Sequence, residues 1–174
     1  MEADERRRFE QATLPHLDAA YNLARWLTRD DHAAEDVVQE AYYRAARYFG
    51  SFRGGDGRVW LLSVVRRASY DWLTKRRAQV AVAFDEDLHH RHDDSTNPEF
   101  LAIRKCDRER VRQALDELPP QLREVILLRD LEGLSYQEIA SVTEIPIGTV
   151  MSRLSRGRKQ LQGRLASYPE GEAI

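Results

Sequence analysis

Apolar residues recur along this chain at the three-to-four-residue spacing of amphipathic helices, and no alternating strand pattern persists. The spacing predicts helices over residues 9–27, 32–49, 58–77, 99–118 and 121–131, with Asp31 as the cap of the second. The buried stripe of the second helix is expected to hold Val37, Ala41, Ala45 and Tyr48. The pattern therefore predicts an all-α fold.

Residues 134–159 predict a helix-turn-helix. Ser135 caps the first helix with Glu138 as its capping-box partner, and Pro146 and Gly148 interrupt the run before a second helix that starts near Thr149. One face of the second helix carries Val150, Leu154, Gly157 and Leu161, and the other carries Ser152, Ser155, Arg156 and Lys159, with Arg153 on its flank. Such a helix offers donors and positive charge to a DNA major groove. The alternative is an ordinary helical hairpin with a solvated basic face.

Residues 83–98 are acidic, polar and poor in core residues, which is typical of an interdomain linker. The chain is therefore expected to form two small helical domains joined by a flexible linker. We place the domains at residues 1–80 and 101–168 and the acidic linker at 81–100.

Charge is segregated along the chain, although the formal net charge is only −2. Basic residues gather in residues 43–80 and 148–165, and acidic residues in 30–40 and 85–99. This pattern predicts two surfaces that meet phosphate. In the first, Arg66, Arg67, Tyr70 and Arg77 are expected on one exposed face of the third helix, a mixture that suits single-stranded DNA. The alternative for that face is simple solvation.

Composition and motifs argue against other classes. No apolar run approaches the roughly 20 residues of a membrane span, and the N-terminus lacks the apolar core of a signal peptide, so a cytoplasmic protein is expected. The single cysteine, Cys106, excludes an internal disulfide. No catalytic triad or phosphate-binding glycine loop is found, and the histidines at 89, 90 and 92 are interpreted as a solvated linker. We expect no catalysis, no metal and no cofactor.

Two groups of segments resemble bacterial sigma factors of the extracytoplasmic-function group. Residues 31–40 (DHAAEDVVQE), 52–55 (FRGG) and 58–67 (RVWLLSVVRR) resemble their region 2. Residues 118–129 (LPPQLREVILLR) and the helix-turn-helix resemble their region 4. The resemblance runs in the family's order over residues 9–165 and implies an alternative sigma factor, which binds core RNA polymerase, recognises promoter DNA and nucleates its opening. A helix-turn-helix regulator that binds duplex operators without polymerase is the alternative.

The resemblance also implies residue roles. It assigns docking on the clamp helices of the largest polymerase subunit to Asp36, Gln39, Glu40 and Tyr43. Contacts to the minus-ten element fall to Phe52, Arg53, Gly54 and Asp56 in a base-capturing loop and to Arg66, Arg67 and Tyr70 on the following helix. Contacts to the minus-thirty-five element fall to Thr149, Ser152, Arg153, Ser155, Arg156 and Lys159.

The chain departs from the family at Arg67, Met151 and Ser155, so the promoter sequence cannot be transferred from a relative. The resemblance further implies a monomer when free of partners and an anti-sigma protein as a partner. It identifies neither that protein nor the inducing signal.

Overall fold

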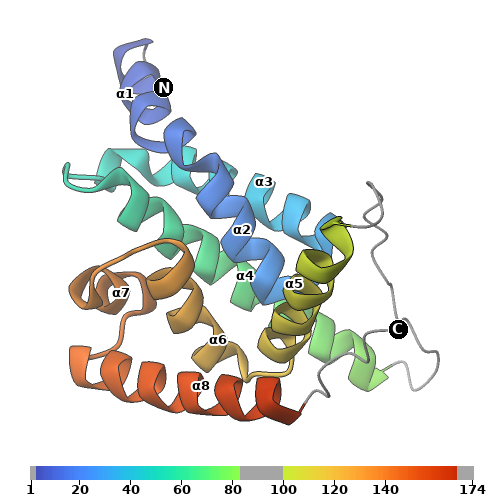
Figure 1. The fold of residues 1–174 in the computed structure, drawn as a ribbon. Coiled ribbons are helices and arrows are strands. Elements are labelled where there is room, and N and C mark those ends of the chain that lie inside the picture. Colours follow the sequence, from blue (N-terminus) through green and yellow to red (C-terminus); the bar gives the residue numbers. More distant parts are fainter. Residues whose placement is uncertain (1–2, 83–99, 168–174) are drawn as a thin grey trace.

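The structure, a computed structural model, describes residues 3–82 and 100–167, with side chains described from residue 108 onward in the second range. Every regular element in these ranges is helical, and two helical units follow one another along the chain (Figure 1). The N-terminal unit comprises α1 (Ala3–Thr13), α2 (Leu17–Thr28), α3 (Asp31–Tyr48) and α4 (Gly57–Val82), with short 3₁₀ turns at Leu14–His16 and Phe49–Ser51. The C-terminal unit comprises α5 (Phe100–Asp116), α6 (Pro120–Ile126), α7 (Tyr136–Thr143) and α8 (Ile147–Ser167), with a π-helical turn at Leu127–Leu131. The predicted all-α fold with two helical domains is confirmed.

Several predicted boundaries were wrong for local reasons. The helix expected over residues 9–27 is interrupted by the turn at Leu14–His16, where Pro15 cannot donate a backbone hydrogen bond. Asp30, not Asp31, caps α3, since its carboxylate accepts a hydrogen bond from the Ala33 N–H at 2.9 Å. Tyr48 is 59% exposed and does not join the buried stripe of Val37, Ala41 and Ala45.

The helix-turn-helix forms as its local signals predict. The Ser135 hydroxyl accepts from the Glu138 N–H at 3.2 Å, and the Glu138 carboxylate accepts from the Ser135 N–H at 2.6 Å, which completes the capping box. Glu144 ends α7 in the left-handed conformation, with a φ of 57°. The second helix, α8, begins at Ile147, two residues before the predicted start, and its buried face holds Val150, Leu154 and Gly157.

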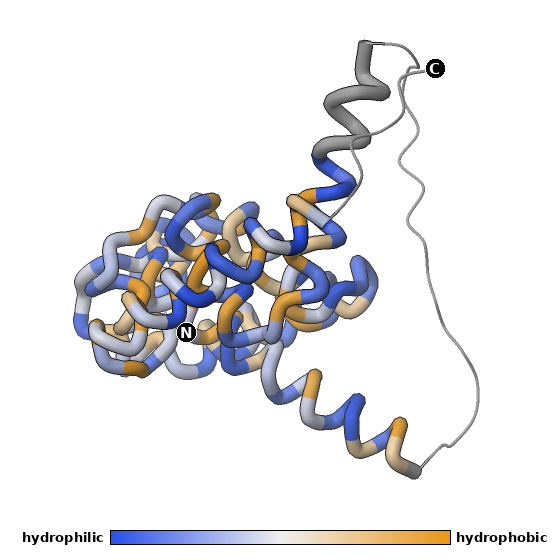
Figure 2. The backbone as a smooth tube through the Cα atoms, turned by 60° about the horizontal axis from the view of Figure 1, so that its bottom comes forward, coloured by the Kyte–Doolittle hydropathy of each residue, from blue (hydrophilic) through white to orange (hydrophobic). Residues whose placement is uncertain are grey.

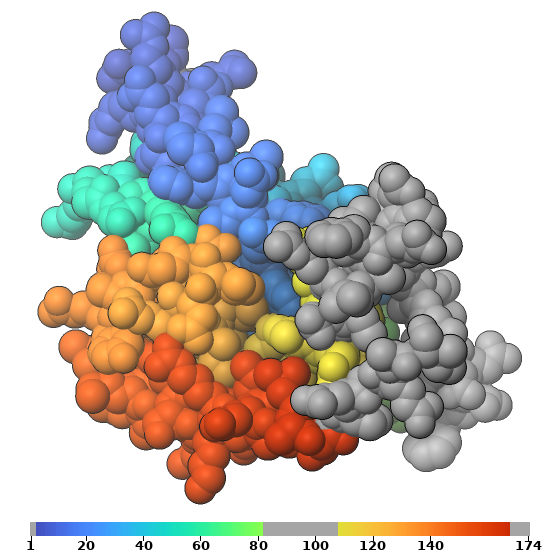
Figure 3. All heavy atoms as spheres, in the orientation of Figure 1, coloured from blue at the N-terminus to red at the C-terminus, as the bar shows by residue number. Residues whose placement is uncertain are grey.

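The two units pack directly on each other. Helix α7 lies against α4, and α6 lies against α2. In the space-filling view, atoms of the α6–α7 segment (orange) abut those of the N-terminal unit (blue and teal) (Figure 3). The buried apolar side chains of both units form one connected cluster. Of the predicted linker, residues 83–99 lie outside the described residues, while residues 81 and 82 extend α4, whose C-terminal end projects from the body of helices (Figure 2).

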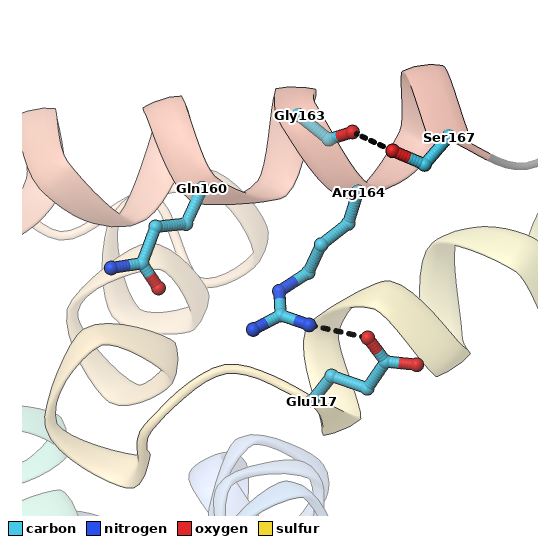
Figure 4. A pocket seen from close by; sticks show the side chains of 5 residues that line it. All are labelled: Glu117, Gln160, Gly163, Arg164 and Ser167. Atoms are coloured by element: carbon cyan, nitrogen blue, oxygen red, sulfur yellow. Dashed lines mark hydrogen bonds and ion pairs between the residues drawn. The ribbon is translucent and has the colours of Figure 1, made fainter.

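Helix α8 is also tied to the end of α5. Arg164 reaches across a shallow pocket and pairs with Glu117, while Gln160 extends into the same space (Figure 4). This contact lies within the C-terminal unit and fixes the far end of α8.

Candidate functional site

Helix α3 presents the predicted docking face to solvent. Asp36, Gln39, Glu40 and Tyr43 are all exposed, and Tyr43 is 62% exposed. Glu40 pairs with Arg44 at 2.7 Å, whereas no ion pair involves Asp36 within the described ranges. These four residues lie together on one side of α3, away from the buried stripe.

An open groove of about 640 Å³ adjoins this face, between α2 and α3. Apolar side chains line part of it (Leu17, Tyr21, Val38 and Tyr42), and polar side chains line the rest (Asp18, Glu35, Asp36 and Gln39). A groove with an apolar lining and three carboxylates suits a helix that carries both apolar and basic residues.

The predicted base-capturing loop is held at both ends. The Phe52 ring stacks on Phe49, with centroids 5.5 Å apart, and lies 4.9 Å from the Trp60 ring. At the other end, Asp56 caps α4 by accepting from the Arg58 N–H at 2.8 Å. Between these anchors Arg53 and Gly54 are exposed. The loop is therefore open to solvent, while Phe52 and Asp56 also have structural tasks.

The predicted strand-binding face of α4 is largely covered at Arg66 and Tyr70, whereas Arg67 is exposed. Arg66 donates from Nε and Nη2 to the Glu124 carboxylate at 2.8 and 3.1 Å, and its guanidinium lies 4.6 Å from the centre of the Tyr70 ring. Arg67 pairs with Glu144 near the surface. The expectation that Arg66 and Tyr70 are exposed was wrong, because the C-terminal unit covers them.

The electrostatics of this contact follow from burial. Burial lowers the pKa of Arg66, but the hydrogen bond and charge of Glu124 outweigh it, so that the pKa lies above its ordinary value. Burial, followed by the nearby charge of Glu124, raises the pKa of Tyr70, whose hydroxyl has no hydrogen-bond partner among the described residues. Both side chains therefore keep their ordinary protonation state at neutral pH.

Helix α8 exposes most of its predicted DNA-binding face. Ser152, Ser155, Arg156 and Lys159 are exposed, and neither Arg156 nor Lys159 forms an ion pair with another described residue. Thr149 is half-buried, and Arg153 turns inward to within 3.8 Å of the Glu124 carboxylate. The two free cations thus stand on the outer side of α8.

Sequence reasoning missed two buried charged residues of α6. Arg123 donates to the carbonyl oxygens of Leu115, Asp116 and Leu118 and, from the N-terminal unit, Trp26, over distances of 2.7–2.9 Å. Burial lowers the pKa of Arg123 to about 10, which leaves it charged at neutral pH. Glu124 is fully buried. Their position between Leu122 and Val125, inside an apolar run, is the signal that could have identified them.

Residues 3–82 and 100–167 contain neither a membrane-spanning helix nor, among their described side chains, a cluster that could hold a metal ion. No helix there is long and apolar enough to cross a membrane, and no group of three or more histidine, cysteine, aspartate or glutamate side chains is placed to hold a metal ion. The predicted histidine-containing linker lies outside the described residues.

Two family models match separate parts of the chain. The model for sigma-70 region 2 matches residues 14–79, and the model for sigma-70 region 4 matches residues 108–161. The first contains the exposed face of α3, the loop and nearly all of α4, and the second contains the helix-turn-helix.

Three relatives of similar sequence are named as RNA polymerase sigma factors. The ECF RNA polymerase sigma factor SigE of Mycolicibacterium smegmatis is 34% identical over 91% of this chain, which spans 65% of that relative's length. The RNA polymerase sigma-H factor of Pseudomonas aeruginosa is 32% identical over 92% of this chain and 88% of its own length. The ECF RNA polymerase sigma-E factor of Escherichia coli is 33% identical over 75% of this chain and 72% of its own.

Two solved structures are also similar to this chain. RpoE in complex with the anti-sigma factor NepR, from Bartonella quintana, aligns with a TM-score of 0.73 at 29% identity, covering 92% of this chain and 98% of that one. CnrH in complex with the cytosolic domain of CnrY aligns with a TM-score of 0.66 at 25% identity, covering 93% of this chain and 90% of that one. By fold and sequence, the chain belongs to the sigma-70 family of RNA polymerase sigma factors, within its extracytoplasmic-function group.

Proposed function

We propose that this chain is a promoter-specificity subunit that acts in the cytoplasm, is not itself a catalyst, and directs core RNA polymerase to its promoters. In this proposal residues 1–80 dock on polymerase and melt the minus-ten element, and residues 101–168 read the minus-thirty-five element. The exposed acidic face of α3 carries the proposal, because a simple duplex-binding regulator has no use for an acidic surface beside an apolar groove.

Docking uses Asp36, Gln39, Glu40 and Tyr43 together with the groove between α2 and α3. The resemblance implies the clamp helices of the largest polymerase subunit as the partner. Apolar contacts in the groove would supply affinity, and the carboxylates would select basic partner residues and speed encounter.

DNA recognition divides between two sites. Arg156 and Lys159 are exposed and unpaired among the described residues, which supports a role at the minus-thirty-five element. The glycines at 54 and 55 have φ angles of 89° and 104°, and no atom lies within 4 Å of a side chain built at either, so this loop leaves room for a flipped base. An anti-sigma protein remains part of the proposal and is supported by the structural relative bound to one.

The test is copurification with core polymerase from the source organism. Asp36→Lys in the full-length chain should lose binding, whereas Glu109→Lys, an equal charge change at an exposed position of α5, should bind as the wild type does. Wild-type yield of polymerase with Asp36→Lys would overturn the docking assignment. A second assay, transcription from a genomic fragment library by core polymerase with and without the chain, tests promoter selection directly.

A further inference from the structure

The side-chain ion pairs between the two units all have their positive charge on the N-terminal unit and their negative charge on the C-terminal unit. In each of these pairs among the described residues the arginine belongs to the N-terminal unit and the carboxylate to the C-terminal unit: Arg29 with Asp116 at 3.7 Å, Arg58 with Glu132 at 2.6 Å, Arg66 with Glu124 at 2.8 Å, and Arg67 with Glu144. Three of these arginines lie on α4. The C-terminal unit therefore presents a set of acids to the basic face of α4.

Glu124 is the centre of this contact. Its side chain is 0% exposed, and a buried carboxylate requires paired charge and hydrogen bonds. Arg66 supplies two hydrogen bonds from the other unit, and Arg153 lies 3.8 Å away within the same unit. Because Arg66 is itself only 17% exposed, little of its guanidinium remains for another anion.

Apolar and backbone contacts reinforce the ion pairs. Arg123 of α6 donates to the Trp26 carbonyl oxygen of α2 at 2.7 Å, and the apolar side chains of both units form one connected cluster. Tyr70, the aromatic side chain of the same α4 face, is half-buried with its hydroxyl enclosed. The two units are therefore joined by a packed interface that contains apolar and backbone contacts as well as ion pairs.

Carboxylates and phosphates occupy the same positions around an arginine, because both accept its paired N–H groups. Arg66 cannot bind Glu124 and a DNA phosphate with the same donors, and Tyr70 cannot stack on a base while it is half-buried against the C-terminal unit. By contrast, the docking face of α3 and the outer face of α8 stay open. This packing therefore blocks the binding of single-stranded DNA by α4, while polymerase docking by α3 and duplex binding by α8 remain accessible.

We propose that the free chain adopts a closed form in which carboxylates of the C-terminal unit occupy the strand-binding face of α4, as an intramolecular substitute for promoter phosphates. This inference rests on the proposed role of α4 in holding the opened strand. The closed chain can bind polymerase and duplex DNA, but it can bind single-stranded DNA through α4 only after the two units separate.

Closure is tested in the full-length chain by energy transfer between dyes. The single cysteine is removed by Cys106→Ser, and dyes are attached through Asn22→Cys on α2 and Gln162→Cys on α8, both exposed positions. Glu132→Lys with Glu144→Lys should lower the transfer efficiency, and adding Arg58→Glu with Arg67→Glu should restore it. A matched control, Glu109→Lys with Asp130→Lys, carries the same charge change at two carboxylates whose ion pairs lie within the C-terminal unit, and it should behave as the wild type.

Inhibition is tested by affinity for a fluorescein-labelled oligothymidylate. If opening moves the closed-to-open ratio from about 10:1 to about 1:10, the Glu132→Lys, Glu144→Lys chain should bind roughly tenfold more tightly than the control pair. Energy transfer that is equally low in the wild type and the variant would overturn the closed form and leave the proposed function standing. A closed wild type whose opened variant gains no affinity over the control would overturn the inhibitory role, and with it the assignment of α4 as the strand-binding helix.

Discussion

Gly57, the first residue of α4, leaves no space for a side chain. A Cβ atom built there would lie 2.3 Å from the carbonyl oxygen of Ala12 in α1. Unlike Gly54 and Gly55, Gly57 does not have a positive φ, so glycine is needed here for space and not for backbone conformation. Gly57→Ala should therefore force α1 away from α4 where the loop at residues 52–56 joins the helix.

The size of the effect follows from that distance. Van der Waals contacts between heavy atoms lie near 3.5 Å, so the backbones must separate by about 1 Å, and rotation of a side chain cannot relieve the clash. Overpacking of this kind costs about 1–3 kcal/mol. Gly163 in α8 is the control, because no atom lies within 4 Å of a Cβ built there. Alanine at that helical position should stabilise the protein by up to ~1 kcal/mol.

Urea unfolding followed by circular dichroism compares both variants with the wild type. The free energy of unfolding should fall for Gly57→Ala and should stay constant or rise for Gly163→Ala. Helix propensity alone would favour alanine at both positions, so opposite signs isolate the contact with Ala12. If Gly57→Ala proves as stable as Gly163→Ala, the close approach of α1 and α4 is wrong.

Further predictions concern four exposed residues. Asp36→Lys should change the free energy of unfolding by about 0.5 kcal/mol or less, as measured in urea, because no ion pair involves it in the described residues. Arg156→Ala should weaken the minus-thirty-five complex by about 1–3 kcal/mol and relax preference at one base pair, while Lys159→Ala should weaken specific and scrambled sites equally in anisotropy titrations. Ser135→Ala should lower the free energy of unfolding by about 1 kcal/mol through loss of the capping box, as measured by thermal unfolding.

Local sequence signals predicted local structure well. The capping box at Ser135, the break near Pro146 and the buried face of α8 each depend on residues within a few positions, and the structure reproduces them. Errors arose where two neighbours compete, as when Asp30 rather than Asp31 capped α3, or where Pro15 ended a helix despite continuous apolar periodicity. The assigned polymerase and DNA contacts stay predictions.

Long-range burial could not be predicted in the same way. Periodicity identifies which side of α4 carries Arg66 and Tyr70, but it does not say what lies opposite, because Glu124 is 58 residues further along the chain than Arg66. The pattern equally gave no reason to pair Arg67 with Glu144. Charge segregation along the chain predicted only surfaces that bind phosphate, so the pairing of basic residues of α4 with carboxylates of the C-terminal unit was not anticipated.

Tyr70 gives a prediction whose sign separates the closed form from the DNA-bound one. Its hydroxyl is enclosed without a hydrogen-bond partner among the described residues, a state that costs about 1–3 kcal/mol for a buried polar group. Tyr70→Phe removes that group, keeps the ring under Arg66, and should raise the free energy of unfolding by about 1 kcal/mol. Because the phenylalanine ring can still stack on a base, the substitution should not impair strand opening directly. Any loss of opening on polymerase, measured by permanganate reactivity of thymines, should come only from the greater stability of the closed form. Loss of stability in Tyr70→Phe would mean that the hydroxyl is satisfied, and that the closed interface differs from the one described.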